Sequence, residues 1–144
     1  MARFCIDTNI LIYSIDKDAG TRHDQARVMV DRLADADCVL TLQALAEFFH
    51  AVTRKNKMPV AEAASMVCDW MELFPVATAD GRNLKEAMRL KEQEGFSFWD
   101  AMLIEAARAS GVTSLLSKDL QDGRLIGALR VENPFKDDFN LGLD

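Results

Sequence analysis

Near the start of the chain stands the stretch Arg3-Phe4-Cys5-Ile6-Asp7-Thr8-Asn9-Ile10-Leu11. Residues 3–6 form a short, mainly apolar run, too short for a helix, which predicts a buried strand. Asp7, Thr8 and Asn9 are residue types that favour turns and helix N-caps. The stretch therefore predicts a strand that is followed at once by a helix start, with a short helix that continues over residues 10–15.

The same alternation continues along the chain. Further strands are predicted over residues 38–42, 75–78, 113–117 and 129–132. Apolar residues at three- and four-residue intervals predict helices over 22–36, 43–55, 59–74, 80–94 and 97–110. Short strands that alternate with helices indicate an α/β fold: a three-layer α/β/α sandwich with a central, mostly parallel sheet of four to five strands.

The length of 144 residues and the apolar fraction of 49% suit one compact domain. We predict that this domain covers residues 1–134 and that residues 135–144 form a polar C-terminal tail. No stretch approaches the roughly 18 apolar residues of a membrane span, and residues 1–7 lack the apolar run of a secretory signal. Cys5, Cys38 and Cys68 are widely spaced among apolar residues, which predicts reduced, buried thiols in a cytoplasmic protein with no membrane partner.

The chain is acidic, with 23 acidic and 17 basic residues and a net charge of −6. This charge argues against a nucleic-acid-binding protein with a generally basic surface. It does not exclude a nuclease whose carboxylates gather in one pocket to hold divalent cations. Where the charges lie matters more than their total.

Four acidic side chains stand at informative places. Asp7 follows the first predicted strand, Glu47 lies early in the helix after the second, and Asp119 follows the strand over 113–117. Asp100 lies in the first turn of its helix, where Ser97 begins a capping pattern. Ligands of open parallel sheets bind at the carboxyl ends of the strands, so these residues can meet in one pocket.

A cluster of carboxylates needs compensation, because two charges about 4 Å apart repel by roughly 4 kcal/mol at an effective dielectric near 20. A shared proton, an Arg or Lys partner, or a divalent cation can supply it. Oxygen ligands favour Mg²⁺ or Mn²⁺ over zinc. A metal that activates water in such a pocket suits the hydrolysis of phosphodiesters.

Each of these residues also has a purely structural explanation. Asp7 suits the cap of the following helix, and Asp100 suits a capping-box acid that the helix dipole favours. Asp119 suits a turn close to Asp122-Gly123, and Glu47 suits a solvated helix face. Only the joint placement of the four carboxylates favours a functional site.

The residues resemble a known family at four places in order: Asp7-Thr8-Asn9-Ile10-Leu11, Leu45-Ala46-Glu47-Phe48, Phe98-Trp99-Asp100-Ala101 and Ser117-Lys118-Asp119-Leu120-Gln121-Asp122-Gly123. These segments look like the successive motifs of PIN-domain ribonucleases, specifically the VapC toxins of toxin–antitoxin systems. The resemblance extends from residue 3 to about residue 133. It implies a PIN-like fold and a Mg²⁺- or Mn²⁺-dependent endoribonuclease that hydrolyses RNA.

The resemblance also implies roles for single residues. Asp7 and Asp100 match the principal metal ligands of the family. Glu47 and Asp119 match residues that orient the water, bind the metal through water or hold a second ion. In this resemblance the four carboxylates are both the metal ligands and the catalytic residues.

Supporting roles follow in the same way. Thr8 matches a small hydroxyl residue near the metal waters, and Asn9 matches an amide that ties the loops together. Ser117 opens the last motif, and Asp122 is a secondary acidic member. Lys118 departs from the pattern, because relatives of this type often carry Glu at this position.

The partners that the resemblance implies are an RNA substrate, a cognate antitoxin protein bound in a groove near the active site, and a second copy of the chain in a homodimer. Arg82, Lys85 and Arg89 form a basic stripe at helical spacing that suits either RNA contact or an ordinary solvated face.

Two rival functions stay open at this point. A small-molecule metal phosphohydrolase needs the same kind of acidic pocket, although the DxDx[TV] nucleophile motif of one phosphatase group is absent after Asp7. A non-catalytic PIN-like binding module would be expected to lose its acidic residues, and all four positions are acidic here.

Overall fold

A six-stranded sheet runs through the centre of the protein, whose computed structural model describes residues 1–143. The strands lie in the order β3-β2-β1-β4-β6-β5, and all neighbours pair in parallel except β5 with β6. Their bounds are β1 (Phe4–Ile6), β2 (Cys38–Thr41), β3 (Val76–Ala77), β4 (Ser114–Leu116), β5 (Leu125–Ile126) and β6 (Leu129–Glu132).

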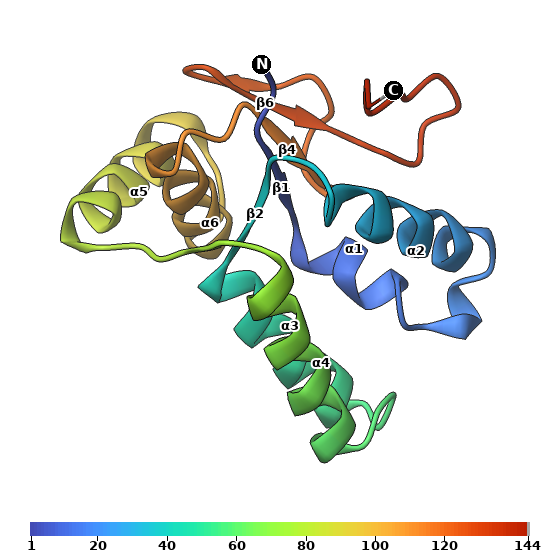
Figure 1. The fold of residues 1–144 in the computed structure, drawn as a ribbon. Coiled ribbons are helices and arrows are strands. Elements are labelled where there is room, and N and C mark those ends of the chain that lie inside the picture. Colours follow the sequence, from blue (N-terminus) through green and yellow to red (C-terminus); the bar gives the residue numbers. More distant parts are fainter. Residues whose placement is uncertain (144) are drawn as a thin grey trace.

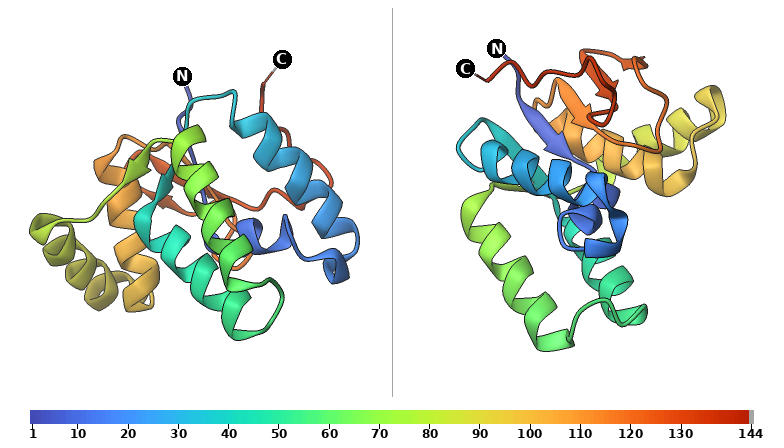
Figure 2. Two further views of the ribbon diagram at one scale, coloured as in Figure 1. Left: turned by 60° about the horizontal axis from the view of Figure 1, so that its bottom comes forward. Right: turned by 90° about the vertical axis from the view of Figure 1, so that its right-hand side faces the viewer.

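Helices cover both sides of this sheet. Their bounds are α1 (Thr8–Tyr13), α2 (Thr21–Leu33), α3 (Leu42–Arg54), α4 (Val60–Leu73), α5 (Gly81–Glu94) and α6 (Phe98–Ala109). In Figure 1, α5 and α6 lie on one side of the strands and α1 and α2 on the other, which gives the expected three layers. Figure 2 shows from other sides that α3 and α4 pack together and extend beyond the sheet.

The central strand β1 is the most enclosed part of the sheet. It pairs with β2 on one edge and β4 on the other, and Phe4, Cys5 and Ile6 are all buried. An uninterrupted apolar run is what a strand covered on both faces requires. The pairing continues one residue further, because the Asp7 N–H donates to the Leu116 carbonyl over 2.9 Å.

Side-chain caps start the helices where the sequence predicts them. Asp80 accepts hydrogen bonds from the N–H groups of Arg82 and Asn83 at the start of α5, and the Ser97 hydroxyl accepts one from the Asp100 N–H over 3.3 Å at the start of α6. These contacts confirm Asp80 and Ser97 as caps, and they satisfy N–H groups that have no partner within the helix.

Two details of the predicted fold differ from the structure. The sheet has six strands rather than four to five, because β5 was not predicted. This strand has only two residues and pairs antiparallel with β6 through a tight turn, so it has no run that a sequence pattern could detect. In addition, α1 ends at Tyr13 rather than at residue 15, whereas its predicted start directly after the first strand is confirmed, because the Asp7 carboxylate caps the Thr8 N–H.

The cysteines were predicted to be buried, and this holds for two of the three. Cys5 and Cys38 lie in the core, but Cys68 is exposed on α4. The reason is that α4 buries mainly the face that carries Ala63 and Trp70, whose ring meets the Phe48 ring edge-on with centroids 4.7 Å apart. All three thiols are free.

The C-terminal segment packs on the domain through apolar side chains at spaced positions. Phe135, Phe139, Leu141 and Leu143 are partly buried against the core, and the Phe135 ring meets the Tyr13 ring edge-on at 5.5 Å. The Arg32 guanidinium donates to the Leu143 carbonyl. The division of the chain into residues 1–134 and 135–144 stays a prediction.

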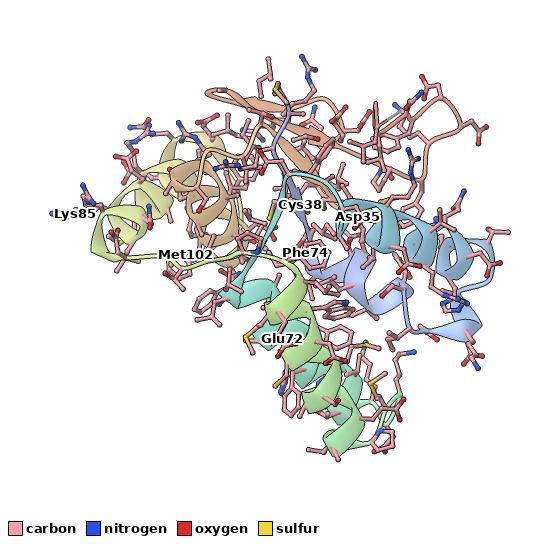
Figure 3. All side chains as sticks on the ribbon, in the orientation of Figure 1. Asp35, Cys38, Glu72, Phe74, Lys85 and Met102 are labelled. Carbon is pink, nitrogen blue, oxygen red and sulfur yellow. The ribbon has the colours of Figure 1, made fainter. Side chains whose placement is uncertain are left out.

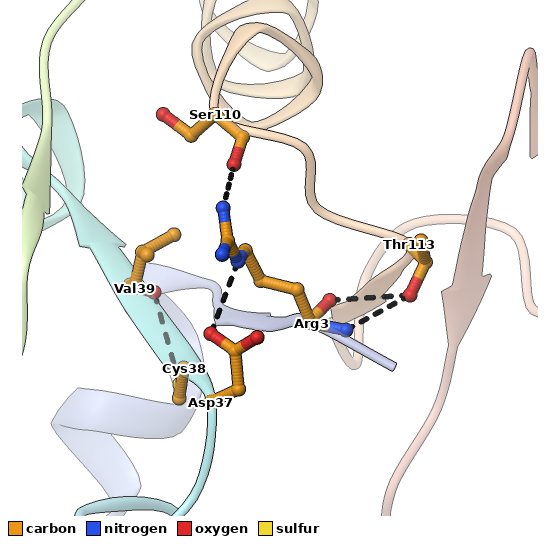
Figure 4. A network of polar contacts seen from close by, with 6 residues as sticks. All are labelled: Arg3, Asp37, Cys38, Val39, Ser110 and Thr113. Carbon is orange, nitrogen blue, oxygen red and sulfur yellow. Dashed lines mark hydrogen bonds and ion pairs between the residues drawn. The ribbon is translucent and has the colours of Figure 1, made fainter. Parts of the chain in front are cut away.

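Arg3 fastens the amino-terminal end of β1. Its side chain donates to the Asp37 carboxylate over 3.0 Å and to the Ser110 carbonyl over 2.6 Å, and its backbone N–H donates to the Thr113 hydroxyl (Figure 4). The contacts tie the starts of β1, β2 and β4 together. Within residues 1–143, no helix has the length and apolarity needed to cross a membrane.

Gly127, in the turn between β5 and β6, gives a test of how closely this turn packs on Arg108. Its φ is +60°, and a Cβ there would lie 2.7 Å from Nη2 of Arg108, whose guanidinium is held by the buried Glu105. We expect Gly127→Ala to destabilise the protein by more than the roughly 1–2 kcal/mol that a left-handed conformation costs. Urea unfolding measures the change.

Gly95→Ala is the matched control, because Gly95 also has a positive φ of +76° but no atom within 4 Å of the added Cβ. If both variants lose the same free energy of unfolding, the contact with Arg108 adds nothing to the cost of the left-handed backbone conformation.

Candidate active site

The carboxyl ends of the parallel strands position three of the four predicted carboxylates. Asp7 follows β1, Glu47 lies in the second turn of α3 directly after β2, and Asp119 lies in the loop after β4. Asp100 comes to the same region because α6 packs against β2. The fold thus brings segments that are far apart in the sequence to one edge of the sheet, as expected for a parallel sheet.

Asp7 is held firmly at this edge. Its Oδ1 accepts the Thr8 N–H over 2.7 Å, and its Oδ2 accepts the hydroxyl of the buried Ser117 over 2.7 Å. The pKa of Asp7 is raised to about 6, mainly by burial and to a smaller extent by the nearby charges of Asp100 and Glu47, while the bonds from Ser117 and Thr8 act in the opposite direction. Asp7, Glu47 and Asp100 therefore form one electrostatically coupled group, which we call the carboxylate group.

Glu47 is exposed, but its carboxylate is oriented by two donors. Its Oε1 accepts the Thr8 hydroxyl over 3.3 Å and the Gln43 amide over 3.2 Å. The same amide nitrogen of Gln43 donates to the Trp99 carbonyl over 2.9 Å, so one side chain joins α3 to the start of α6. Sequence reasoning missed Gln43; its position four residues before Glu47 on a helix was the available signal.

Asp119 is tied through Asn9 to the segment that follows Asp7. The Asn9 amide donates to Oδ2 of Asp119 over 3.1 Å, and the Asn9 Oδ1 accepts the Lys118 N–H over 3.5 Å. This amide links the loops after β1 and β4, which is the arrangement that the resemblance implied. The Lys118 ammonium lies 3.6 Å from Oδ1 of Asp119, so the departure at Lys118 places a positive charge beside this carboxylate.

Asp122 is not brought to the carboxylate group. Its Oδ1 accepts the Asn133 N–H and its Oδ2 accepts the Lys136 ammonium, both over 2.7 Å. The bond from Lys136 and that from Asn133 hold the pKa of Asp122 below its ordinary value. In this structure Asp122 fastens the segment after β6 to the loop after β4.

The three members of the carboxylate group have no cationic partner within residues 1–143: none of them forms an ion pair with Lys, Arg or His. Across that same part of the chain, no three His, Cys, Asp or Glu side chains converge closely enough to hold a metal ion by themselves. Because no Arg or Lys partner is found among these residues, the repulsion between the clustered carboxylates can be compensated by a shared proton or by a hydrated cation.

The basic stripe on α5 is largely paired within its own helix. Arg82 lies 3.7 Å from Asp80 and Arg89 lies 2.9 Å from Glu86. Lys85 lies at the outer edge of α5 (Figure 3). These exposed ion pairs are typical of an ordinary solvated helix face, which explains Arg82 and Arg89 without RNA contact.

Comparison with known proteins identifies the class. A model of the PIN domain family matches residues 4–121, which include all four candidate carboxylates. The chain belongs to the PIN domain family. A comparison with curated protein sequences gives no significant match.

Solved structures of VapC-type proteins share the fold. The sarcin-ricin-loop-cleaving toxin VapC20 of Mycobacterium tuberculosis is 19% identical, with a TM-score of 0.62 over 81% of this chain and 91% of that one. VapBC2 of Rickettsia felis, bound to promoter DNA, is 19% identical, with a TM-score of 0.65 over 90% of this chain and 97% of that one. A toxin–antitoxin complex of Klebsiella pneumoniae is 17% identical, with a TM-score of 0.66 over 94% of this chain and 99% of the matched chain.

The raised pKa of Asp7 predicts a pH-dependent cost in stability. The folded protein favours the protonated carboxyl, so the stabilising contribution of this protonated form is complete below the ordinary pKa of 3.8 and is lost as the pH rises through about 6. In chelating buffer, we expect Asp7→Asn to have a higher Tm than the parent at pH 7.5, with the two values converging toward pH 4. Thermal unfolding followed by circular dichroism measures both.

Ser117→Ala is the companion variant. It removes a hydrogen bond that lowers the pKa of Asp7, so it should increase the loss of stability between pH 4 and pH 7.5. A Tm difference between Asp7→Asn and the parent that is the same at both pH values would contradict a raised pKa of this half-buried carboxyl.

Proposed function

We propose that this PIN-domain protein is a divalent-metal-dependent endoribonuclease, the toxin component of a VapBC-type toxin–antitoxin module, and that it hydrolyses RNA phosphodiester bonds in the cytoplasm. The observation that carries the proposal is the carboxylate group itself. Asp7 is half-buried beside the charges of Asp100 and Glu47, and no Lys, Arg or His among the described residues neutralises them. Such an arrangement costs stability and is retained where function requires it.

The donor set fits Mg²⁺ or Mn²⁺ with water ligands. Hard cations take carboxylate oxygens, and Mg²⁺ commonly keeps several waters and adds substrate phosphate oxygens. This agrees with carboxylates that do not converge tightly enough to enclose an ion alone. Asp7 and Asp100 would hold the ion, with Glu47 and Asp119 at its waters. When bound, the ion would supply a polarised phosphate and a more acidic water.

The protein's own contacts prepare these carboxylates for that role. Ser117 and Thr8 fix both oxygens of Asp7, and Gln43 orients Glu47. Asn9 holds Asp119. Oriented ligands lower the cost of ordering the site when substrate binds.

A cognate antitoxin and a second copy of the chain are the proposed protein partners. The similar structures from Rickettsia felis and Klebsiella pneumoniae are complexes of a toxin with an antitoxin. On α4, Val60, Met71 and Leu73 are exposed, and exposed apolar residues gathered on one helix are typical of protein interfaces.

Cleavage of RNA tests the catalytic proposal. We expect the purified, antitoxin-free protein to cut a mixed cellular RNA pool with Mg²⁺ or Mn²⁺ and not with EDTA. Asp7→Asn and Asp100→Asn should each lower the rate about a hundredfold or more, because each removes a charge from the metal site. Glu72→Gln is the control, since Glu72 is an exposed carboxylate on α4.

Cutting that persists in EDTA, or in both Asn variants, would contradict the proposal. If no RNA is cut under any condition, hydrolysis of a small phosphate ester with the same metals separates the phosphohydrolase alternative from the non-catalytic binding module.

The oligomeric state is tested separately. Light scattering should give about twice the chain mass of 16.1 kDa for the parent. Leu73→Asp, which places a charge on an exposed apolar position of α4, should shift the mass toward that of one chain. Leu125→Asp is the matched control, because Leu125 is similarly exposed but lies on β5. A parent that scatters as a single chain contradicts the homodimer.

A further inference from the structure

Trp99 is exposed at the edge of the candidate site. The chain has two tryptophans: Trp70 is packed in the core with 7% of its surface exposed, whereas Trp99 is 62% exposed. Leu42, the first residue of α3, is also half exposed. Large apolar side chains that are exposed at a candidate active site are candidates for contact with a ligand.

The side chain and backbone of Trp99 are held in place. The Phe98 ring meets the Trp99 ring at 68° with centroids 4.9 Å apart, and the Trp99 carbonyl accepts the Gln43 amide over 2.9 Å. Trp99 also lies in the first turn of α6, which Ser97 caps. The indole is therefore positioned before any ligand arrives, which lowers the entropy cost of binding.

The same contacts fix Trp99 relative to the carboxylate group. Asp100 is the next residue, and the Gln43 amide that holds the Trp99 carbonyl also binds Oε1 of Glu47. The backbone of Trp99 is thus next to the carboxylates that the proposed function places at the scissile phosphate.

We propose that Trp99 is a stacking platform for one base of a single-stranded RNA substrate, next to the bond that is cut. This inference rests on the proposed function and names how the substrate is held. Where no cation shields it, the acidic edge repels phosphates, whereas the face of a base is uncharged and stacks well on aromatic rings. Stacking accepts every base, so Trp99 would place the strand without selecting its sequence.

Intrinsic fluorescence tests the platform without relying on cleavage. In a Trp70→Phe background, Trp99 is the single tryptophan. In EDTA, we expect a 12-residue oligoadenylate to quench its emission to saturation, and an abasic ribose-phosphate chain of equal length to leave it unchanged. Anisotropy of the labelled oligonucleotide gives the affinity in parallel.

Substitutions then separate stacking from structure. Trp99→Ala should weaken oligoadenylate binding on the order of tenfold, whereas Trp99→Phe, which keeps an aromatic face, should restore most of it. Val28→Ala is the matched control, because Val28 is similarly exposed on α2 and lies outside the site. The Tm of each variant shows whether it is folded.

Several outcomes would overturn the inference: no binding of oligoadenylate, equal quenching by the abasic chain, or full affinity in Trp99→Ala. A concentration-dependent blue shift of Trp99 emission without RNA would also overturn it, because a second copy of the chain would then cover the indole.

If the parent cuts RNA but these results appear, only the stacking platform fails. If Trp99 stacks as expected but no RNA is cut with metal, only the proposed function fails.

Discussion

The parallel pairing of β1 between β2 and β4 is the constraint on which the rest of the structure depends. It fixes the loop after each strand at one edge of the sheet, and it does so through backbone hydrogen bonds between buried residues. Arg3 fastens the opposite ends of the same three strands. Because β1 is only three residues long, a shift of one residue in its register would displace Asp7 and reverse the faces of the strand.

The candidate site combines rigid support with unfavourable charge. Buried hydroxyl and backbone donors hold Asp7, while Asp100 and Glu47 oppose its ionisation. Thr8 and Gln43 connect Asp7 and α6 to Glu47. The side chains that bear charge are therefore linked by neutral hydrogen-bonding groups, which orient the carboxylates without removing the repulsion between them.

Some features could be predicted because they leave a local mark in the sequence. The apolar run before Asp7 and the caps at Asp80 and Ser97 each predict an element boundary that the structure confirms. The parallel sheet then predicts that distant carboxylates meet. Hydrogen bonds between side chains and distant segments leave no such mark in the sequence. The bond from Gln43 to the Trp99 carbonyl depends on how α6 packs, and the bond from Lys136 to Asp122 depends on how the C-terminal segment packs.

The unequal burial of the three cysteines has a practical chemical consequence. Burial raises the pKa of the Cys5 thiol to about 12 and raises that of Cys38 as well, so neither forms the reactive thiolate near neutral pH. Cys68 is exposed on α4. A maleimide reagent would therefore modify the native chain at one place, on the helix pair that extends beyond the sheet, and an attached fluorophore would report contacts made by that pair without any engineered residue.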